Sequence, residues 1–287
     1  MKQILLCTDG SLFAQSSYPY AAWLAPRLDA EVNVLFVSDI RSQKVASTGN
    51  YSGAIGLGAS RELLNQLVEL EHQKAKLNHQ KAQLILEDAE QRLKAEGVSA
   101  IELTHETGFL VDIFHEFEEQ ADLIILGKRG EAADFASDHL GANVERIARA
   151  STKPCLVTSR EYQPIERMLL AYDGSKSCQK MLDFLTTSPA FQGLELHILT
   201  VAKKAGDENA TAHLRLADLQ ARQAGFQTIS EKAIGDPETT ILRYLDQHNI
   251  NLLLMGAYGH SRIRRLVIGS TTIQLLRSSQ IPVLLFR

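Results

Sequence analysis

The chain has few cysteines and no long hydrophobic run, and both absences narrow what it can be. Its three cysteines, Cys7, Cys155 and Cys178, form no Cys-x-x-Cys pair and supply no disulfide framework. No apolar stretch reaches the roughly 18 residues that cross a bilayer, and the first apolar run begins too close to Met1 to leave room for a signal peptide. We therefore expect a cytoplasmic protein with reduced cysteines and no membrane contact.

The chain also lacks an excess of positive charge. It carries 34 acidic and 30 basic residues, a formal net charge of −4, which argues against a general nucleic-acid binder. With 45% hydrophobic and 22% charged residues, the composition is ordinary for a globular protein. A length of 287 residues suits two domains, which we place at residues 1–160 and 165–287.

An internal repeat supports this division. Three sequence landmarks occur in the same order in both halves, as expected of a tandem duplication. They are ILLCTDGS at 4–11 and MLLAYDGS at 168–175, DLIILGKRG at 122–130 and NLLLMGAYG at 251–259, and KPCLV at 153–157 and QIPVL at 280–284.

Short, almost wholly apolar runs alternate with helical patterns in each half, which predicts buried parallel strands joined by helices. The expected fold is α/β, with two tandem doubly wound open parallel sheets of five strands each. Ligands of such sheets bind beyond the carboxyl ends of the strands. The expected strands are 4–8, 31–37, 101–105, 122–126 and 154–158 in the first half, and 167–172, 195–201, 228–233, 251–255 and 282–286 in the second.

A glycine-containing loop follows the fourth apolar run of the second half. Gly256 and Gly259 allow backbone amides to approach a ligand, and Gly269-Ser270-Thr271 can present N–H groups and hydroxyls where a helix begins. Three arginines at 262, 264 and 265 lie between them. Unpaired donors, a helix N-terminus and guanidinium groups together favour a di- or triphosphate.

The spacing Gly-x2-Gly-x9-Gly-Ser matches neither a Walker loop nor a dinucleotide fingerprint. It resembles the nucleotide-binding signature of the universal stress protein family, and the two sets of motifs extend that resemblance over essentially the whole chain, as a tandem member. The resemblance implies a Rossmann-like fold of the adenine nucleotide alpha hydrolase type that binds ATP, with Mg²⁺. The site residues that it implies are Ala171, Asp173, Val201, Gly256, Gly259, His260, Arg262, Gly269, Ser270 and Thr271.

Within that resemblance, Asp173 would contact the ribose, Val201 would meet the adenine through its backbone, and the glycines, His260 and the two hydroxyl residues would hold the phosphates. Each of the first two has a purely structural alternative. Asp173 can form an Asx turn or cap a helix in Asp-Gly-Ser, and Val201 can be a core residue of its strand.

The first half departs from this signature. Ten residues rather than nine precede Gly141, and Ala142-Asn143 stands where the second half has Ser270-Thr271. Acidic residues at 131, 134 and 138 replace the arginines, so a polyphosphate would be repelled unless Lys128 and Arg129 compensate. We expect a nucleotide in the second half only.

The first half also carries an insertion. Asp9 and Gly127 are 118 positions apart, whereas Asp173 and Gly256 are 83 apart. Residues 61–96 contain neither glycine nor proline, which predicts a long helix. Leucines at 63, 70, 77 and 84 recur every seven residues, as at one of the two core positions of a coiled coil. The other core position is polar, with Lys74, Lys81 and Asp88, so the apolar face is narrow for a coiled coil. The helix projects to cover the pocket of the first half or to contact a partner protein, or else it adds to the core.

No nucleophile elbow or metal-binding histidine motif is present, so we assign no catalytic or metal residue and expect at most slow ATP hydrolysis. The first hypothesis is a stress-response protein in which bound ATP alters a surface that partner proteins recognise. The second is an interaction scaffold whose halves pair through their final strands as a pseudo-dimer, without a functional nucleotide site. The third is an enzyme resembling electron-transfer flavoproteins, since fold alone does not fix function. Paired final strands would allow either a monomer or a homodimer.

Overall fold

A computed structural model of the chain describes residues 2–40, 57–130, 140–257 and 270–287. The first repeat contains five strands and five described helices. These are β1 (Lys2–Thr8), α1 (Leu12–Gln15), α2 (Tyr18–Leu28), β2 (Ala30–Asp39), α4 (Leu57–Ala95), β3 (Ile101–Gly108), α5 (Leu110–Glu118), β4 (Leu123–Gly127), α6 (Ala142–Ala150) and β5 (Cys155–Thr158).

The second repeat follows the same order of elements. It comprises β6 (Arg167–Ala171), α7 (Lys176–Thr187), the short 3-10 helix η2 (Pro189–Phe191), β7 (Glu195–Ala202), α8 (Glu208–Gln223), β8 (Thr228–Ile234), α9 (Pro237–Gln247), β9 (Leu252–Gly256), α10 (Ser270–Ser278) and β10 (Val283–Phe286).

The strands of both repeats form one sheet in the order β3-β2-β1-β4-β5-β10-β9-β6-β7-β8. Within each repeat all the pairings are parallel, whereas β5 and β10 pair antiparallel, with Leu156 opposite Leu284. The parallel α/β fold expected from the sequence is confirmed, but the two sheets are continuous. They join because each repeat ends in a short apolar strand whose outer edge would otherwise leave its backbone groups unpaired.

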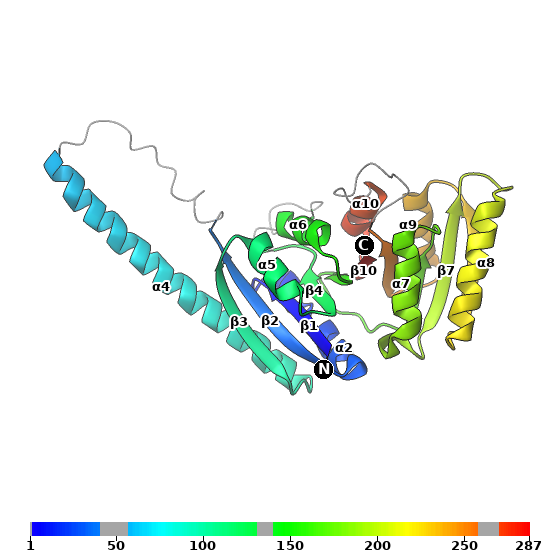
Figure 1. Cartoon of the computed structure of the whole chain (residues 1–287), viewed down its shortest axis with the longest axis horizontal. Helices are drawn as coiled ribbons and strands as arrows, with labels where there is room; N and C mark the ends of the chain where they lie inside the picture. The colour runs from blue at the N-terminus through cyan, green and yellow to red at the C-terminus, as the bar shows by residue number, and fades with distance from the viewer. Residues whose placement is uncertain (1, 41–56, 131–139, 258–269) are drawn as a thin grey trace.

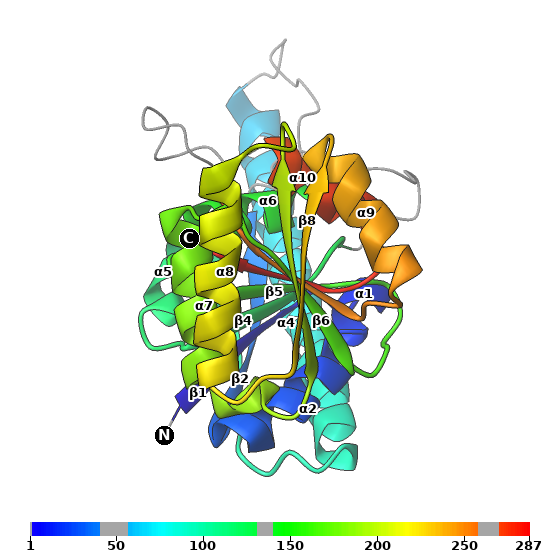
Figure 2. The ribbon, with the colours of Figure 1, turned by 90° about the vertical axis from the view of Figure 1, so that its right-hand side faces the viewer.

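Helices cover both faces of this sheet because alternate residues of each buried strand point to opposite sides. Ile4 and Leu6 belong to one core and Leu5 to the other, and all three are fully buried. In the second repeat, α7 and α8 pack on one side of the fanned strands and α9 and α10 on the other (Figure 2). This doubly wound arrangement explains why inner strands such as β4 and β9 are apolar without alternation.

The long helix α4 is an extended version of α8. Both helices end two residues before a glycine with positive φ, Gly97 and Gly225, and both pack on the second and third strands of their repeat. The last four turns of α4 carry the buried face Ala82, Leu86, Ala89 and Leu93. The earlier turns continue beyond the sheet, so α4 projects from the body (Figure 1). The sequence-based prediction of a long helix at 61–96 is confirmed.

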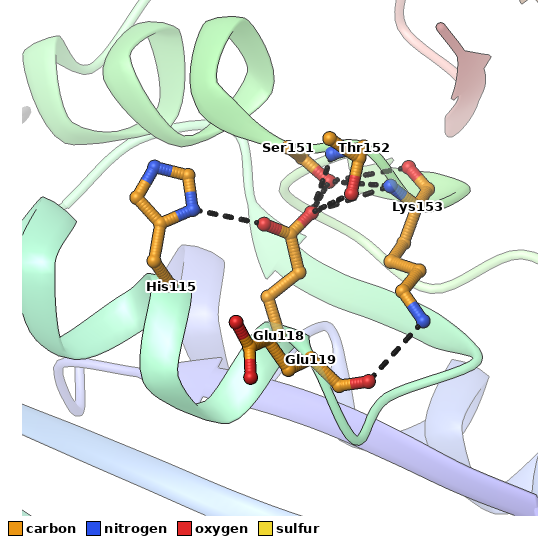
Figure 3. A network of polar contacts seen from close by, with 6 residues as sticks. All are labelled: His115, Glu118, Glu119, Ser151, Thr152 and Lys153. Atoms are coloured by element: carbon orange, nitrogen blue, oxygen red, sulfur yellow. Dashed lines mark hydrogen bonds and ion pairs between the residues drawn. The ribbon is translucent and has the colours of Figure 1, made fainter.

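A buried carboxylate fixes the turn that leads into the connecting strand β5. Glu118, at the end of α5, accepts hydrogen bonds from the hydroxyl of Ser151 (2.6 Å) and from the backbone N–H groups of Thr152 (2.5 Å) and Lys153 (3.2 Å) (Figure 3). His115, one turn earlier, contacts its other oxygen at 3.0 Å. Since Glu118 is buried, these donors replace the water that its charge would need.

The three cysteines are free, as expected from their number. Cys155 and Cys178 are buried, and Cys7 is half-buried. Burial raises the pKa of Cys178 to about 11, so its thiol stays protonated and unreactive at neutral pH. The thiols therefore serve as small apolar side chains.

Candidate functional site

The candidate site of the second repeat lies where the strand order reverses. The chain runs outward from β6 through β7 to β8 and then returns to β9 on the other side of β6. Ala171, the last residue of β6, is level with Met255 of β9 and Leu199 of β7. The carboxyl ends of these three strands therefore share one edge, the usual ligand position of a doubly wound sheet.

Asp173 occupies the loop that leaves β6 at this edge. Its side chain is exposed, and its Oδ1 accepts a hydrogen bond from the Ser175 N–H at 2.8 Å. Gly174 between them has φ +75°, and Ser175 then caps α7 by accepting from the Cys178 N–H. The structural alternative for Asp173 is thus realised as an Asx turn, with Ser175 as the helix cap. This turn fixes the carboxylate at the rim of the site.

Gly256 ends β9 where the first turn of α7 crosses it. A Cβ at this position would contact the Ser177 hydroxyl and come within 3.1 Å of the Cys178 backbone nitrogen. A larger residue would therefore push α7 away from the sheet. Packing against α7 therefore requires glycine at this position, whether or not a ligand binds.

Helix α10 begins beside the same strand end. Ser270 is exposed and Thr271 half-buried, while the buried Thr272 donates its hydroxyl to the Gly256 carbonyl oxygen at 3.5 Å. The first N–H groups of a helix have no partner within the helix and carry a partial positive charge. Ser270 and Thr271 thus present donors at the edge that also holds Asp173.

The structure brings six of the expected site residues to this edge: Ala171, Asp173, Val201, Gly256, Ser270 and Thr271. Val201 lies near the end of β7, level with Ala233 of β8, and is half-buried against the core. The other four expected residues, Gly259, His260, Arg262 and Gly269, lie outside the described residues.

One residue near the site was not expected from the sequence. The ring of His213, on α8, lies against Gly174, so that a Cβ on Gly174 would overlap it. The corresponding contact in the first repeat is made by Ile85 of α4 against Gly10. Alignment of α8 with the end of α4 would have located His213, but its ring could be placed beside Asp173 only by the packing of α8 on the sheet.

In the first repeat, the described residues that follow β4 are not arranged to bind a phosphate. The carboxylate of Asp9 lies against Gly130, where a Cβ would come within 2.6 Å of its Oδ2. The Gly141 N–H donates to the Lys128 carbonyl oxygen at 3.2 Å, which draws the end of the loop onto its beginning. The edge of this repeat therefore holds a carboxylate beside the glycine at which a phosphate would approach.

Lys128 cannot compensate for that negative charge, because its side chain points to the other repeat. Its Nζ donates to the carbonyl oxygens of Arg277 (2.6 Å) and Ser279 (2.8 Å), at the C-terminal end of α10. Burial, and secondarily the charge of Arg129, lowers the pKa of Lys128 from 10.5 to about 8. Arg129 remains in the first repeat, with its guanidinium 5.7 Å from the centre of the Phe13 ring.

The described part of the chain places hydrogen-bonding groups at the switch point of the second repeat. In it, no cluster of three or more histidine, cysteine, aspartate or glutamate side chains could hold a metal ion. Across residues 2–40, 57–130, 140–257 and 270–287, no helix has both the length and the apolar character needed to cross a membrane. Fold and site together define a tandem doubly wound α/β protein in which the strand order of each repeat reverses at a switch point.

Comparisons with known proteins agree with this class. The model of the universal stress protein family matches residues 1–159 and again residues 164–287. A universal stress protein of Synechocystis is 56% identical over 287 residues, which cover the whole of both chains. The chain therefore belongs to the universal stress protein family.

Solved structures show the same tandem fold. The crystal structure of a universal stress protein from Archaeoglobus fulgidus superposes with a TM-score of 0.71 at 24% identity, over 99% of this chain and 98% of that one. A putative universal stress protein from Pseudomonas aeruginosa gives a TM-score of 0.64 at 16% identity, over 100% and 93% of the two chains. At these identities the likeness concerns the fold alone.

Proposed function

We propose that the protein binds one adenine nucleotide, ATP with Mg²⁺, at the switch point of its second repeat, and that the bound nucleotide biases a surface read by partner proteins in a stress response. The observation that carries this proposal is the convergence of Asp173, Gly256 and the N-terminus of α10 on one edge of the sheet. The family membership and the Gly-x2-Gly-x9-Gly-Ser spacing support the choice of ligand.

The donor set fits a nucleotide. Ser270, Thr271 and the first amides of α10 would hold the phosphates, with Gly256, Gly259, His260, Arg262 and Gly269 completing the loop. The exposed carboxylate of Asp173 would accept from ribose hydroxyls, and the backbone at Val201 and Ala171 would border the base. Mg²⁺ in nucleotide sites is usually held by phosphates, water and one or two carboxylates, so it would arrive with ATP.

The first repeat would not bind a nucleotide in the same way. The carboxylate of Asp9 lies against Gly130, and Lys128 is engaged at the far end of α10. A polyphosphate would meet a negative charge there without the hydroxyl groups that Ser270 and Thr271 supply in the second repeat. One ligand per chain is the expected stoichiometry.

Matched substitutions in the two repeats test this proposal. Asp173→Asn and Asp9→Asn both keep an oxygen that can accept from the following serine N–H, so both Asx turns are preserved. Native mass spectrometry and calorimetric titration with Mg-ATP should give one ATP per wild-type chain, weaker binding for Asp173→Asn, and unchanged binding for Asp9→Asn.

A negative charge introduced at the N-terminus of α10 provides a second test of ATP binding. Ser270→Glu places a carboxylate at the N-terminus of α10, which suits the helix dipole but repels phosphate. Its counterpart is Ala142→Glu at the start of α6. Loss of ATP only in Ser270→Glu supports the proposal, and two ATP per chain contradicts it.

The scaffold hypothesis rests on a separate observation, the antiparallel pairing of β5 with β10, which joins the repeats as a pseudo-dimer without any ligand. It predicts that no ATP binds to the wild type and that partner capture is the same for Ser270→Glu. The two hypotheses therefore give opposite results in the same experiments.

A further inference from the structure

The helix α4 carries an exposed leucine stripe on the side that faces away from the body. Leu70, Leu77 and Leu84 are 50%, 64% and 67% exposed and recur every seven residues, so they lie on one face of the helix. Leu84 is two positions from the buried Ala82, about 200° around the helix. The described body of the chain packs against the opposite face and therefore does not cover this stripe.

The stripe extends along the projecting part of α4. Every described side chain from 65 to 77 is exposed, including that of Leu67. From Leu67 to Leu84 the stripe is roughly 25 Å long at 1.5 Å per residue. Four leucines along one helix face are more than the single exposed apolar residues that are normal on a protein surface.

The charges beside the stripe are ordered along the helix. Glu69 and Glu71 precede Lys74, Lys76 and Lys81, so the projecting part changes from acidic to basic near its middle. Within one helix these charges make little stabilising contact. The Lys74–Glu71 pair, at 3.2 Å, is more than half exposed at both ends, so water and salt screen it strongly.

We propose that this face of α4 binds the same face of a second copy of the chain, with the two helices antiparallel and a two-fold axis near residue 73. That register places Leu67 and Leu70 of one copy beside Leu77 of the other. It also places the acidic stretch of Glu69 and Glu71 beside the basic stretch of Lys74 and Lys76. A parallel pair would bring like charges together along the whole contact.

The two lysines in the seam decide the orientation rather than prevent pairing. Lys74 and Lys81 lie at the positions that alternate with the leucines, where a polar residue lowers the stability of a coiled coil but selects its register. In the antiparallel pair the long stem of Lys74 can lie along Leu70 of the partner while its ammonium group reaches the partner's Glu71. The two bodies then lie at opposite ends of the paired helices.

The mass of the full-length protein in solution tests the pairing. Light scattering after gel filtration should give twice the chain mass of 31.8 kDa at tens of micromolar. Leu70→Glu/Leu77→Glu should give the chain mass with an unchanged circular dichroism spectrum, because both leucines are exposed. Leu216→Glu on α8, where the leucine is 64% exposed, is the control and should stay dimeric. A monomeric wild type, or a dimer that survives the double substitution, overturns the proposal.

Charge exchange tests the orientation. Glu69→Lys/Glu71→Lys should dissociate the dimer, and adding Lys74→Glu/Lys76→Glu should restore it, because the reversed pattern is again self-complementary only when antiparallel. The fourfold variant should pair with itself and not with the wild type. Preferential mixing of the two, or failure of the fourfold variant to dimerise, overturns the antiparallel arrangement.

Discussion

The ammonium group of Lys128, in the first repeat, lies 2.8 Å from the carbonyl oxygen of Ser279, in the second. The same group donates to the Arg277 carbonyl, so it binds the C-terminal end of the helix whose N-terminus borders the candidate site. Cations stabilise this end of a helix, where the last carbonyl groups lack partners. The equivalent position of the second repeat is Ala257, and this contact therefore breaks the symmetry of the tandem fold.

Removing the ammonium group should destabilise the fold. Lys128→Met retains most of the side-chain volume but removes the donor from the buried contact with the Ser279 carbonyl and the part-buried contact with the Arg277 carbonyl, at a cost of about 1–3 kcal/mol. Urea denaturation measures the change in the free energy of unfolding. Lys180→Met is the matched control, because Lys180 also donates to a backbone carbonyl but is exposed, and it should change stability by less than about 0.5 kcal/mol.

The same lysine should make stability depend on pH. Folding lowers its pKa from 10.5 to about 8, so between these pH values the unfolded chain binds more protons than the folded one. The stability of the wild type should then rise with pH relative to Lys128→Met, by at most about 1.4 kcal/mol per pH unit. The two carbonyl acceptors favour the charged form and reduce this slope. A difference that stays flat from pH 8 to 10 would show that burial does not shift this group.

Glu118 should be the most sensitive acidic residue of the first repeat. Glu118→Gln retains the shape but loses the charge that accepts from Ser151, Thr152 and Lys153, at a cost of about 1.5–3 kcal/mol. Hydrogen exchange of the β5 amides should also accelerate. Glu119→Gln, at the adjacent exposed position, should leave both measurements unchanged. Equal effects of the two substitutions would argue against the network of Figure 3 as the cause.

Alanine substitutions at Gly174 and Gly193 distinguish the cost of backbone strain from the cost of a steric clash. Both have positive φ, +75° and +83°, but a Cβ would overlap His213 at Gly174 and meet nothing within 4 Å at Gly193. Alanine at either position should cost about 1–2 kcal/mol of strain. Gly174→Ala should cost more, and replacing His213 with alanine in the same chain should recover the difference. If thermal unfolding shows equal losses, His213 does not press on this loop.

Local sequence patterns were enough to predict the strands because apolar runs of four to eight residues between turn residues have few alternative structures. The run at Leu252 and the one at Ile4 were both found in this way, as was the long helix from its lack of glycine and proline. The positions of Asp173 and Gly256 at strand ends followed from the same pattern, since parallel strands place their carboxyl ends together.

The sequence by itself determined the repeat, the α/β class and the side of the sheet on which a ligand would lie, because these depend on short-range periodicity and on the order of the elements. The pairing of the final strands was one of the hypotheses drawn from the sequence. Only the tertiary structure decided that β5 and β10 pair antiparallel within one continuous sheet, that Lys128 crosses to Ser279, and that His213 lies on Gly174. Each of these contacts joins residues far apart in the chain, and their geometry depends on how whole helices and strands pack, which no local pattern encodes.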